Sequence, residues 1–344
     1  MEMELPTSSL REARNRVRNH KDFSNKVHGA LYGVAIGDAL GGPVEFMSAD
    51  EIRRRYGRVE NMIGGGWLGL KPGEVTDDTQ MTIAVADGIL RAVQRVYGHM
   101  RPSRDIENLS FSAGFREEVI SGIGDEFIMW YKSRPKDIGN ACRISIDNAI
   151  HFARGGMSDL KSWEEASKLT HKMLNGQTAG NGSLMRTIYP ALFFWNRDIA
   201  IRVSECQSDM THLHDDARDC CAEYTYMIHT LVRTEATKAH SWLKDRTYTL
   251  SDSLLPQLKM SIIEPTGYVK NSLAVALQSV CSANNFHEAV CNAVNRGGDA
   301  DTIGAIAGGL AGAIWGQAYI PYEWMHTLDA RAKNTLTGLA RYVI

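Results

Sequence analysis

Carboxylates and hydroxyls are gathered in two short segments of the chain, each at the point where a loop runs into small apolar residues. The segments are GEVTDDTQMTIAVADG (73–88), with Thr76, Asp77 and Asp78, and NRGGDADTIGAIAGG (295–309), with Asp299, Asp301 and Thr302. Such oxygen donors suit the hard cations Mg²⁺, Mn²⁺ or Ca²⁺ better than zinc. The four aspartates carry four negative charges, which match two divalent cations and would be costly to keep ionised without them. The two segments therefore predict one site for two divalent cations, assembled by folding.

The same residue types also cap helices. Asp and Thr are favoured at helix N-termini, where acidic side chains in the first turn interact favourably with the helix dipole. Either segment alone fits that structural role, and composition alone leaves the two interpretations balanced. Gly297 and Gly298 permit the extended or turn backbone in which Asp299 and Asp301 can point the same way. An EF-hand is excluded because its downstream ligands are missing.

Two further carboxylates stand in glycine-containing segments. Glu45 follows the glycines and proline of GVAIGDALGGPVEFMS, and Asp137 precedes Gly139 and Asn140 in KDIGNACR. A carboxylate in a flexible loop could act as a general acid or base beside a metal. An ordinary surface glutamate and a helix cap are the alternatives, with the backbone amides of Gly139 and Asn140 as candidate ligand contacts.

The segment AGNGSLMR (179–186) is a candidate for contact with phosphate. It contains a tight turn at Asn181 and Gly182, and Ser183 follows as small and polar residues lead into a helix. Backbone N–H groups at such a start can hold a phosphate, although the pattern alone is weak.

One histidine-rich and one aromatic segment are further candidates for substrate contact. In THLHDDA (211–217), His212 and His214 do not share a helix face, so local capping or substrate contact is favoured over metal ligation. Tyr268 stands at a glycine-preceded helix start in GYVKNSLAVAL. It is either an aromatic platform for a base or, as such residues more often are, part of the core.

Helical periodicity dominates the chain, and runs with strict alternation are scarce. The predicted helices cover 27–40, 79–97, 139–153, 161–174, 199–207, 215–232, 269–283, 286–294 and 302–315. Gly304, Gly308 and Gly312 would let the last of these pack very close to a neighbour. No linker rich in Pro and Ser divides the chain. We therefore expect one compact all-α domain over residues 25–344, with long functional loops.

Bulk properties exclude several function classes. A hydrophobic content of 44% and a charged content of 23% are those of a soluble globular protein. The formal net charge of −2 gives no general attraction to nucleic acid or to an anionic membrane. The six cysteines lack a C-x-x-C spacing, which favours free thiols in a reducing compartment. With no visible signal peptide or membrane span, we expect a cytoplasmic protein.

Residues 1–24 form a basic N-terminal extension that differs from the rest. The extension contains Arg11, Arg14, Arg16, Arg18 and Lys21 and few large apolar groups. A solvated helix or tail is the ordinary interpretation, and an arm that contacts an acidic partner is the alternative.

In order along the chain, these segments resemble the ADP-ribosylglycohydrolase family. The resemblance is carried by GVAIGDALGGPVEF, GEVTDDTQMTIAVADG, KDIGNACR, AGNGSLMR, THLHDDA, GYVKNSLAVAL and NRGGDADTIGAIAGGLAGA, which span roughly residues 27–316. It implies an all-α, orthogonal helical bundle with a binuclear Mg²⁺ or Mn²⁺ centre at the mouth of a cleft. It implies metal ligands at Thr76, Asp77, Asp78, Asp299, Asp301 and Thr302, the set that the charge argument selects.

The resemblance also implies a substrate and a reaction. The substrate is an ADP-ribosylated protein side chain, and the segments are more similar to the arginine-specific bacterial hydrolases than to the serine-directed branch. The reaction is hydrolysis of the N-glycosidic bond between ribose and guanidinium, with Asp137, Glu45 or metal-bound Asp78 moving the proton. The implied substrate-binding residues are Gly139, Asn140, Asn181, Gly182, Ser183, Tyr268, Gly297 and Gly298, beside the possible substrate contact of His212.

Two features depart from the family pattern. Ala141 and Cys142 follow the D-I-G-N element, where the family often has threonines, so a hydroxyl contact to substrate is lost. Residues 1–24 lie outside the resemblance, and some family members act as immunity proteins against ADP-ribosylating toxins.

Two alternatives to an arginine hydrolase follow. One is a binding protein that captures an ADP-ribosyltransferase toxin through this arm, and the other is a metal hydrolase for different ADP-ribosyl linkages.

Overall fold

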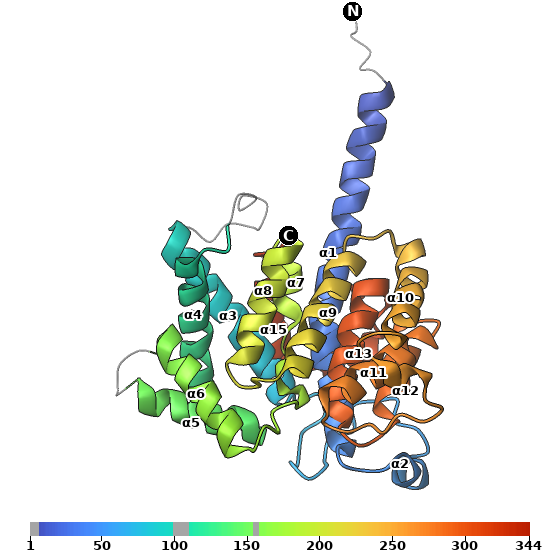
Figure 1. Cartoon of the computed structure of the whole chain (residues 1–344). Helices are drawn as coiled ribbons and strands as arrows, with labels where there is room; N and C mark the ends of the chain where they lie inside the picture. The colour runs from blue at the N-terminus through green and yellow to red at the C-terminus, as the bar shows by residue number, and fades with distance from the viewer. Residues whose placement is uncertain (1–6, 99–109, 154–157) are drawn as a thin grey trace, which may run out of the picture.

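The chain folds into a bundle of helices, as the periodicity predicts. The computed structural model describes residues 7–98, 110–153 and 158–344, with the backbone alone for 7–19 (Figure 1). No strand occurs within these ranges. The helices are α1 (Thr7–Gly41), α2 (Ala49–Tyr56), α3 (Asp77–Tyr97), α4 (Ala113–Lys132), α5 (Asn140–Phe152), α6 (Leu160–Met173), α7 (Ile188–Phe193), α8 (Arg197–Asp209), α9 (Asp215–Leu231), α10 (Ala236–Ser251), α11 (Val269–Cys281), α12 (Phe286–Val294), α13 (Ala300–Trp315), α14 (Tyr322–Thr327) and α15 (Ala330–Ala340). Among them, none has both the length and the apolar character needed to cross a membrane.

Helices α1 and α13 form an antiparallel pair at the centre of the bundle, with α10 to α12 on one side and α3 to α6 on the other (Figure 1). Their backbones touch through glycines spaced four residues apart on both helices. A Cβ on Gly33 would lie 2.0 Å from the Gly308 carbonyl oxygen, and one on Gly37 would lie 1.9 Å from that of Gly304. The close packing expected of the α13 glycines is confirmed. The pairing brings the C-terminal end of α1 to the N-terminal end of α13, at Gly41 and Ala300.

A methyl group in this contact is expected to destabilise the whole bundle. Gly33→Ala should lower the free energy of unfolding by about 3 kcal/mol or more, because backbone atoms of α13 cannot move aside as a flexible side chain would. Gly338→Ala is the matched control, since this helical glycine of α15 has open space where the Cβ would lie. That control should stabilise by roughly 0.4–1 kcal/mol. Urea denaturation of both variants tests the difference, and equal stabilities would contradict the close packing.

Periodicity does not predict six of these helices, namely α2, α4, α7, α10, α14 and α15. In α4, glycines interrupt the pattern for a structural reason. A Cβ on Gly122 would lie 2.4 Å from the Gly88 carbonyl oxygen of α3, and one on Gly124 would lie 2.0 Å from the Trp163 indole nitrogen. The long helix α10 is mostly polar, and its buried apolar residues are few. Both helices are stabilised by neighbours that the local pattern does not reveal.

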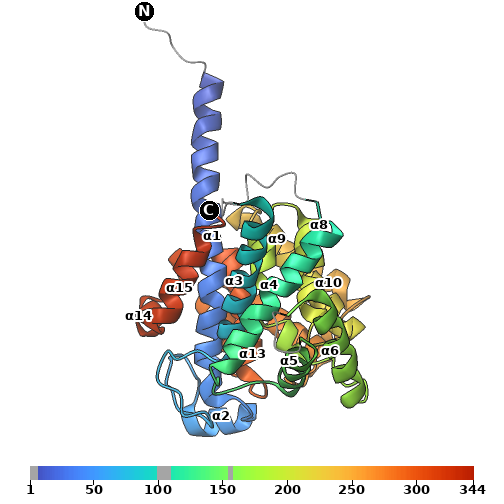
Figure 2. The ribbon, with the colours of Figure 1, turned by 90° about the vertical axis from the view of Figure 1, so that its left-hand side faces the viewer.

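The N-terminal extension and the first helix of the bundle are one element. Helix α1 begins at Thr7 and runs through residue 24 without a break, and its first turns stand clear of the other helices (Figures 1 and 2). Residues 1–6 of the expected extension lie outside the described residues. Near the junction, the Arg233 guanidinium lies 5.4 Å from the centre of the Phe23 ring. Buried Lys26 donates to the Leu231 carbonyl at the end of α9, at 3.2 Å. These contacts anchor α1 where it enters the bundle.

Candidate active site and metal centre

The two acidic segments meet where α3 and α13 begin and α1 ends. Thr302 donates from Oγ1 to Asp78 Oδ2 at 3.5 Å, and the Thr76 hydroxyl oxygen lies 3.3 Å from the same Asp78 oxygen, so one carboxylate joins the two segments. One oxygen each of Glu45, Asp137 and Asp301 lies within 4.8 Å of the other two. The structure therefore brings together carboxylates from four separate parts of the chain.

Burial and mutual repulsion both disfavour the ionised form of these carboxylates. The pKa values of Asp77, Asp78 and Asp301 are raised well above the usual range, first by burial and then by the neighbouring carboxylates. Burial also raises the pKa of Glu45 to about 8, although the Trp67 indole donates to its Oε2 at 2.7 Å. Asp78 Oδ1 is buried and has no hydrogen-bond donor among the described residues. This donor set fits divalent cations, which would supply positive charge and a partner for that oxygen.

Asp38 of α1 holds the first acidic segment in place. It is fully buried and accepts hydrogen bonds from four donors at the start of α3. The Thr76 backbone N–H and hydroxyl donate to Oδ1 at 3.0 Å and 2.8 Å, and those of Thr79 donate to Oδ2 at 3.1 Å and 2.5 Å. Burial raises the pKa of Asp38 to about 6, against these hydrogen bonds. Because the Thr76 hydroxyl hydrogen is directed at Asp38, the lone pairs of its oxygen remain available to a cation.

A cavity of about 580 Å³ opens beside the carboxylates. Its lining includes Glu45, Asp77, Asp137, Gly139, Asn140, Asn181, Gly182, His212, Asp299, Asp301 and Thr302. The Asn181 amide joins the cavity wall to the second acidic segment, since Nδ2 donates to Asp299 Oδ2 at 2.8 Å. The volume is that of a small-molecule site, with polar groups converging on one end.

A buried arginine stands behind this wall. Arg186 is fully buried, and its guanidinium lies 4.3 Å from the centre of the Phe127 ring. Its Nη2 donates to Thr211 Oγ1 at 2.8 Å, and that hydroxyl lies 2.8 Å from Nδ1 of His212. Burial, with the nearby arginine charge, lowers the pKa of His212 to about 3. His212 is therefore a neutral imidazole in the cavity wall.

Comparison with known proteins agrees with this architecture. A model of the family described as ADP-ribosylglycohydrolase matches residues 19–344. The chain belongs to the ADP-ribosylglycohydrolase family. It is 31% identical over 314 residues to the ADP-ribosyl-dinitrogen reductase glycohydrolase of Rhodospirillum rubrum, covering 90% of this chain and 92% of the relative. It is 30% identical over 309 residues to the ADP-ribosylarginine hydrolase Tri1 of Pseudomonas putida, covering 88% and 73%.

The fold is also that of a solved ADP-ribosylglycohydrolase-related structure. A chain of an ADP-ribosylglycohydrolase-related protein complex superposes with a TM-score of 0.68 at 26% identity, covering 94% of this chain and 100% of that one. The all-α fold expected from the sequence is confirmed. As a member of the ADP-ribosylglycohydrolase family, the protein is a hydrolase that removes ADP-ribose.

Four of the residues expected to bind substrate do not line the ADP-ribosylglycohydrolase cavity. Ser183 is fully buried behind it, where its oxygen accepts from the Ser208 hydroxyl at 2.9 Å. Tyr268 begins α11 and donates its phenol hydrogen to Asp216 at 2.8 Å. Gly297 and Gly298 have φ of 72° and 64°, and their backbones pack against residues 47–49 and 265. They shape the loop that carries Asp299, as the sequence predicts.

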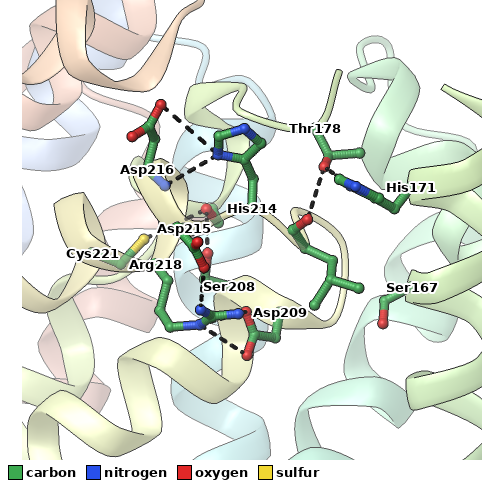
Figure 3. A network of polar contacts seen from close by, with 12 residues as sticks. Ser167, His171, Thr178, Ser208, Asp209, His214, Asp215, Asp216, Arg218 and Cys221 are labelled. Carbon is green, nitrogen blue, oxygen red and sulfur yellow. Dashed lines mark hydrogen bonds and ion pairs between the residues drawn. The ribbon is translucent and has the colours of Figure 1, made fainter. Parts of the chain in front are cut away.

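The segment THLHDDA divides between the cavity and a helix cap. His212 lies in the cavity wall, whereas Nδ1 of His214 accepts from the Asp216 backbone N–H at 3.1 Å and caps α9 (Figure 3). Below it, Arg218 lies between Asp209 and Asp215 (Figure 3). The local capping expected of this segment is confirmed for His214.

Sequence reasoning missed Asp38, Trp67 and Arg186 as parts of the site. Asp38 stands in the quoted segment GVAIGDALGGPVEF, and Arg186 ends AGNGSLMR. A charged residue inside an otherwise apolar helical run is the signal that could have drawn attention to Asp38, because such a residue needs buried partners. Trp67 lies in a loop rich in glycine and offers no comparable signal.

Asp38→Asn is expected to weaken metal binding. The amide nitrogen cannot accept from Thr76 or Thr79, so the start of α3 loses its fixed position, and the affinity for Mn²⁺ should fall by about 10- to 100-fold. Calorimetric titration with Mn²⁺ measures this loss. Asp159→Asn is the control, since Asp159 caps α6 and is not among the residues that line the cavity. Unchanged Mn²⁺ affinity in a folded Asp38→Asn protein would show that Asp38 only caps the start of α3.

Proposed function

We propose that the protein is a hydrolase dependent on Mg²⁺ or Mn²⁺ that releases ADP-ribose from ADP-ribosylated arginine of target proteins. The observation that carries this proposal is a buried Asp78 oxygen to which no described residue donates a hydrogen bond, inside a cluster of carboxylates at the end of a cavity. The 30% identity to a relative named ADP-ribosylarginine hydrolase supports the arginine linkage.

In this proposal the acidic segments hold the cations, and the cavity holds ADP-ribose. The metal ligands are Thr76, Asp77, Asp78, Asp299, Asp301 and Thr302. Two bound cations supply electrostatic polarisation and orientation of the ribose or of a water molecule. The cavity residues Gly139, Asn140, Asn181, Gly182 and His212 hold the substrate, with the neutral His212 offering a hydrogen bond.

Hydrolysis breaks the bond between ribose C1″ and a guanidine nitrogen. A water oxygen becomes attached to C1″, and a proton is placed on the leaving nitrogen. Glu45 and Asp137 both line the cavity and have oxygens within 4.8 Å of each other, which supports a role for either in holding or moving that proton. Asp78, whose Oδ1 accepts no hydrogen bond within the described part of the chain, is the third candidate.

The first experiment measures release of ADP-ribose from an ADP-ribosylarginine protein and from an ADP-ribosylserine peptide. Each substrate is tested with Mg²⁺, with Mn²⁺ and with a chelator. The proposal expects release from the arginine linkage, which the chelator abolishes and added metal restores. Release from the serine peptide alone would show that the enzyme cleaves the serine linkage and not the arginine linkage. No release by a folded, metal-loaded protein would refute the proposal.

A second candidate function is capture of an ADP-ribosyltransferase toxin through residues 1–24. The observation that favours it is the start of α1, which projects from the bundle and precedes the family match at residue 19 (Figure 2). Deleting residues 1–18 separates the two functions. A capture protein would lose its protective effect against the toxin, whereas a hydrolase would keep its rate of ADP-ribose release.

A further inference from the structure

Two aromatic side chains are exposed at the mouth of the cavity. Phe46 and Trp67 are 69% and 56% exposed, although both belong to the lining that includes Asp77 and Asp301. Their ring centroids lie 5.8 Å apart, with the ring planes at 38°. A pair of large apolar rings held in solvent beside buried carboxylates is typical of a surface that a bound molecule covers.

The backbone of Phe46 is held in a conformation that disfavours such a residue. Its φ is 65°, in the left-handed region that favours glycine. Two hydrogen bonds maintain the turn, from the Phe46 N–H to the Gly298 carbonyl at 2.7 Å and from the Gly298 N–H to the Met47 carbonyl at 2.8 Å. Strain retained at the rim of an active site indicates that the position of this ring is functional.

Trp67 is presented by a tight turn of its own. Gly65 and Leu70 exchange two backbone hydrogen bonds of 2.7 Å and 2.8 Å, with Trp67 between them. The turn packs so closely that a Cβ on Gly66 would lie 2.8 Å from the Gly42 carbonyl oxygen. From this position the indole nitrogen donates to Glu45 Oε2 at 2.7 Å. The ring therefore touches the acidic cluster at one edge and solvent elsewhere.

We propose that Phe46 and Trp67 bind the guanidinium of the modified arginine and thereby select the arginine linkage; this rests on the proposed function. With ADP-ribose in the cavity and the scissile bond beside Glu45, the leaving group passes the two rings on its way to solvent. A planar guanidinium is attracted to the faces of aromatic rings and stacks on them. A serine leaving group is neither cationic nor planar, so the same rings do not attract it comparably.

The test compares four variants on an ADP-ribosylarginine peptide with Mg²⁺. Phe46→Leu and Trp67→Leu remove a ring, and each should raise KM by about 5- to 30-fold. Trp67→Phe keeps a ring but removes the N–H to Glu45, so it should change kcat more than KM. Tyr248→Leu is the control, because this residue is 77% exposed and is not among the residues that line the cavity. Its KM should equal that of the wild type.

Binding of free ADP-ribose, measured by calorimetry, isolates the leaving-group contact. The dissociation constant of ADP-ribose should stay within about twofold of wild type in Phe46→Leu and Trp67→Leu, since ADP-ribose carries no guanidinium. Equal losses for peptide and ADP-ribose, or an unchanged KM in both variants, would overturn this inference while leaving the hydrolase intact. A wild-type protein that releases no ADP-ribose from the peptide would instead overturn the proposed function, and this inference with it.

Discussion

Asp301→Asn is expected to reduce ADP-ribose release by on the order of 10³-fold while making the chelated protein more stable. Loss of activity follows because a ligand of the proposed cations loses its charge. The gain in stability follows because Asp301 is fully surrounded by protein and repelled by Asp78, Glu45 and Asp299 when no cation is bound. Asn keeps an oxygen that can accept from the Thr302 N–H, as Asp301 Oδ1 does at 2.8 Å.

The opposite direction of the two effects distinguishes a functional carboxylate from a structural one. A helix cap that loses its charge should lose stability or stay neutral, with activity unaffected. Asp329→Asn provides that comparison, because Asp329 caps α15 through a hydrogen bond from the Ala332 N–H at 2.8 Å. Melting temperatures in chelator and rates of ADP-ribose release with Mg²⁺ are measured for both variants. A destabilised but fully active Asp301→Asn protein would refute the metal site.

Removing the cations should make stability fall as pH rises from about 6.5 to 8. Burial raises the pKa of Glu45 to about 8, and the pKa values of Asp77, Asp78 and Asp301 are well above the usual range. The folded, chelated protein thus holds protons that the unfolded chain releases near pH 4. Where the folded state holds more protons, the free energy of unfolding decreases with pH, by about 1.4 kcal/mol per proton and pH unit.

Buried histidines change the stability at lower pH, and their effect on its pH dependence has the opposite sign. The pKa of His212 is lowered to about 3 and that of His229 to about 4, in both cases mainly by burial. Between these pKa values and about pH 6.5, the two histidines are protonated in the unfolded chain but not in the folded protein. Acid therefore destabilises the protein. Above that window the histidines are neutral in both states, and the carboxylates determine the slope up to about pH 8, where thiols of the unfolded chain begin to ionise.

Urea denaturation at several pH values, with chelator and with Mg²⁺, measures the effect. In chelator, stability should decline toward high pH, and Mg²⁺ should remove the decline because bound cations replace the missing protons. The stabilisation by Mg²⁺ is thus expected to be largest at high pH. A chelated protein whose stability stays constant or increases over the same window would contradict the carboxylate cluster.

The local order of residues was sufficient to predict where oxygen donors gather. Thr76, Asp77 and Asp78 stand at the start of a helix, as do Asp299, Asp301 and Thr302, and residue type alone makes them oxygen donors. The helices α3 and α13 were predictable because their periodicity and their start signals lie within a few residues of each other. The glycines of α13 likewise indicated a close helix contact before the partner helix was known.

Only the tertiary structure decided which distant groups complete the site. Asp38 meets the start of α3 across 38 residues of chain, because the glycine contact of α1 with α13 places it there. The exposed rings of Phe46 and Trp67 depend on two turns that pack against other loops. Ser183 faces the core although Asn181 and Gly182 face the cavity, a choice made by packing against α8. Sequence patterns report neighbours within a few turns of helix, whereas these contacts depend on how whole helices pack against one another.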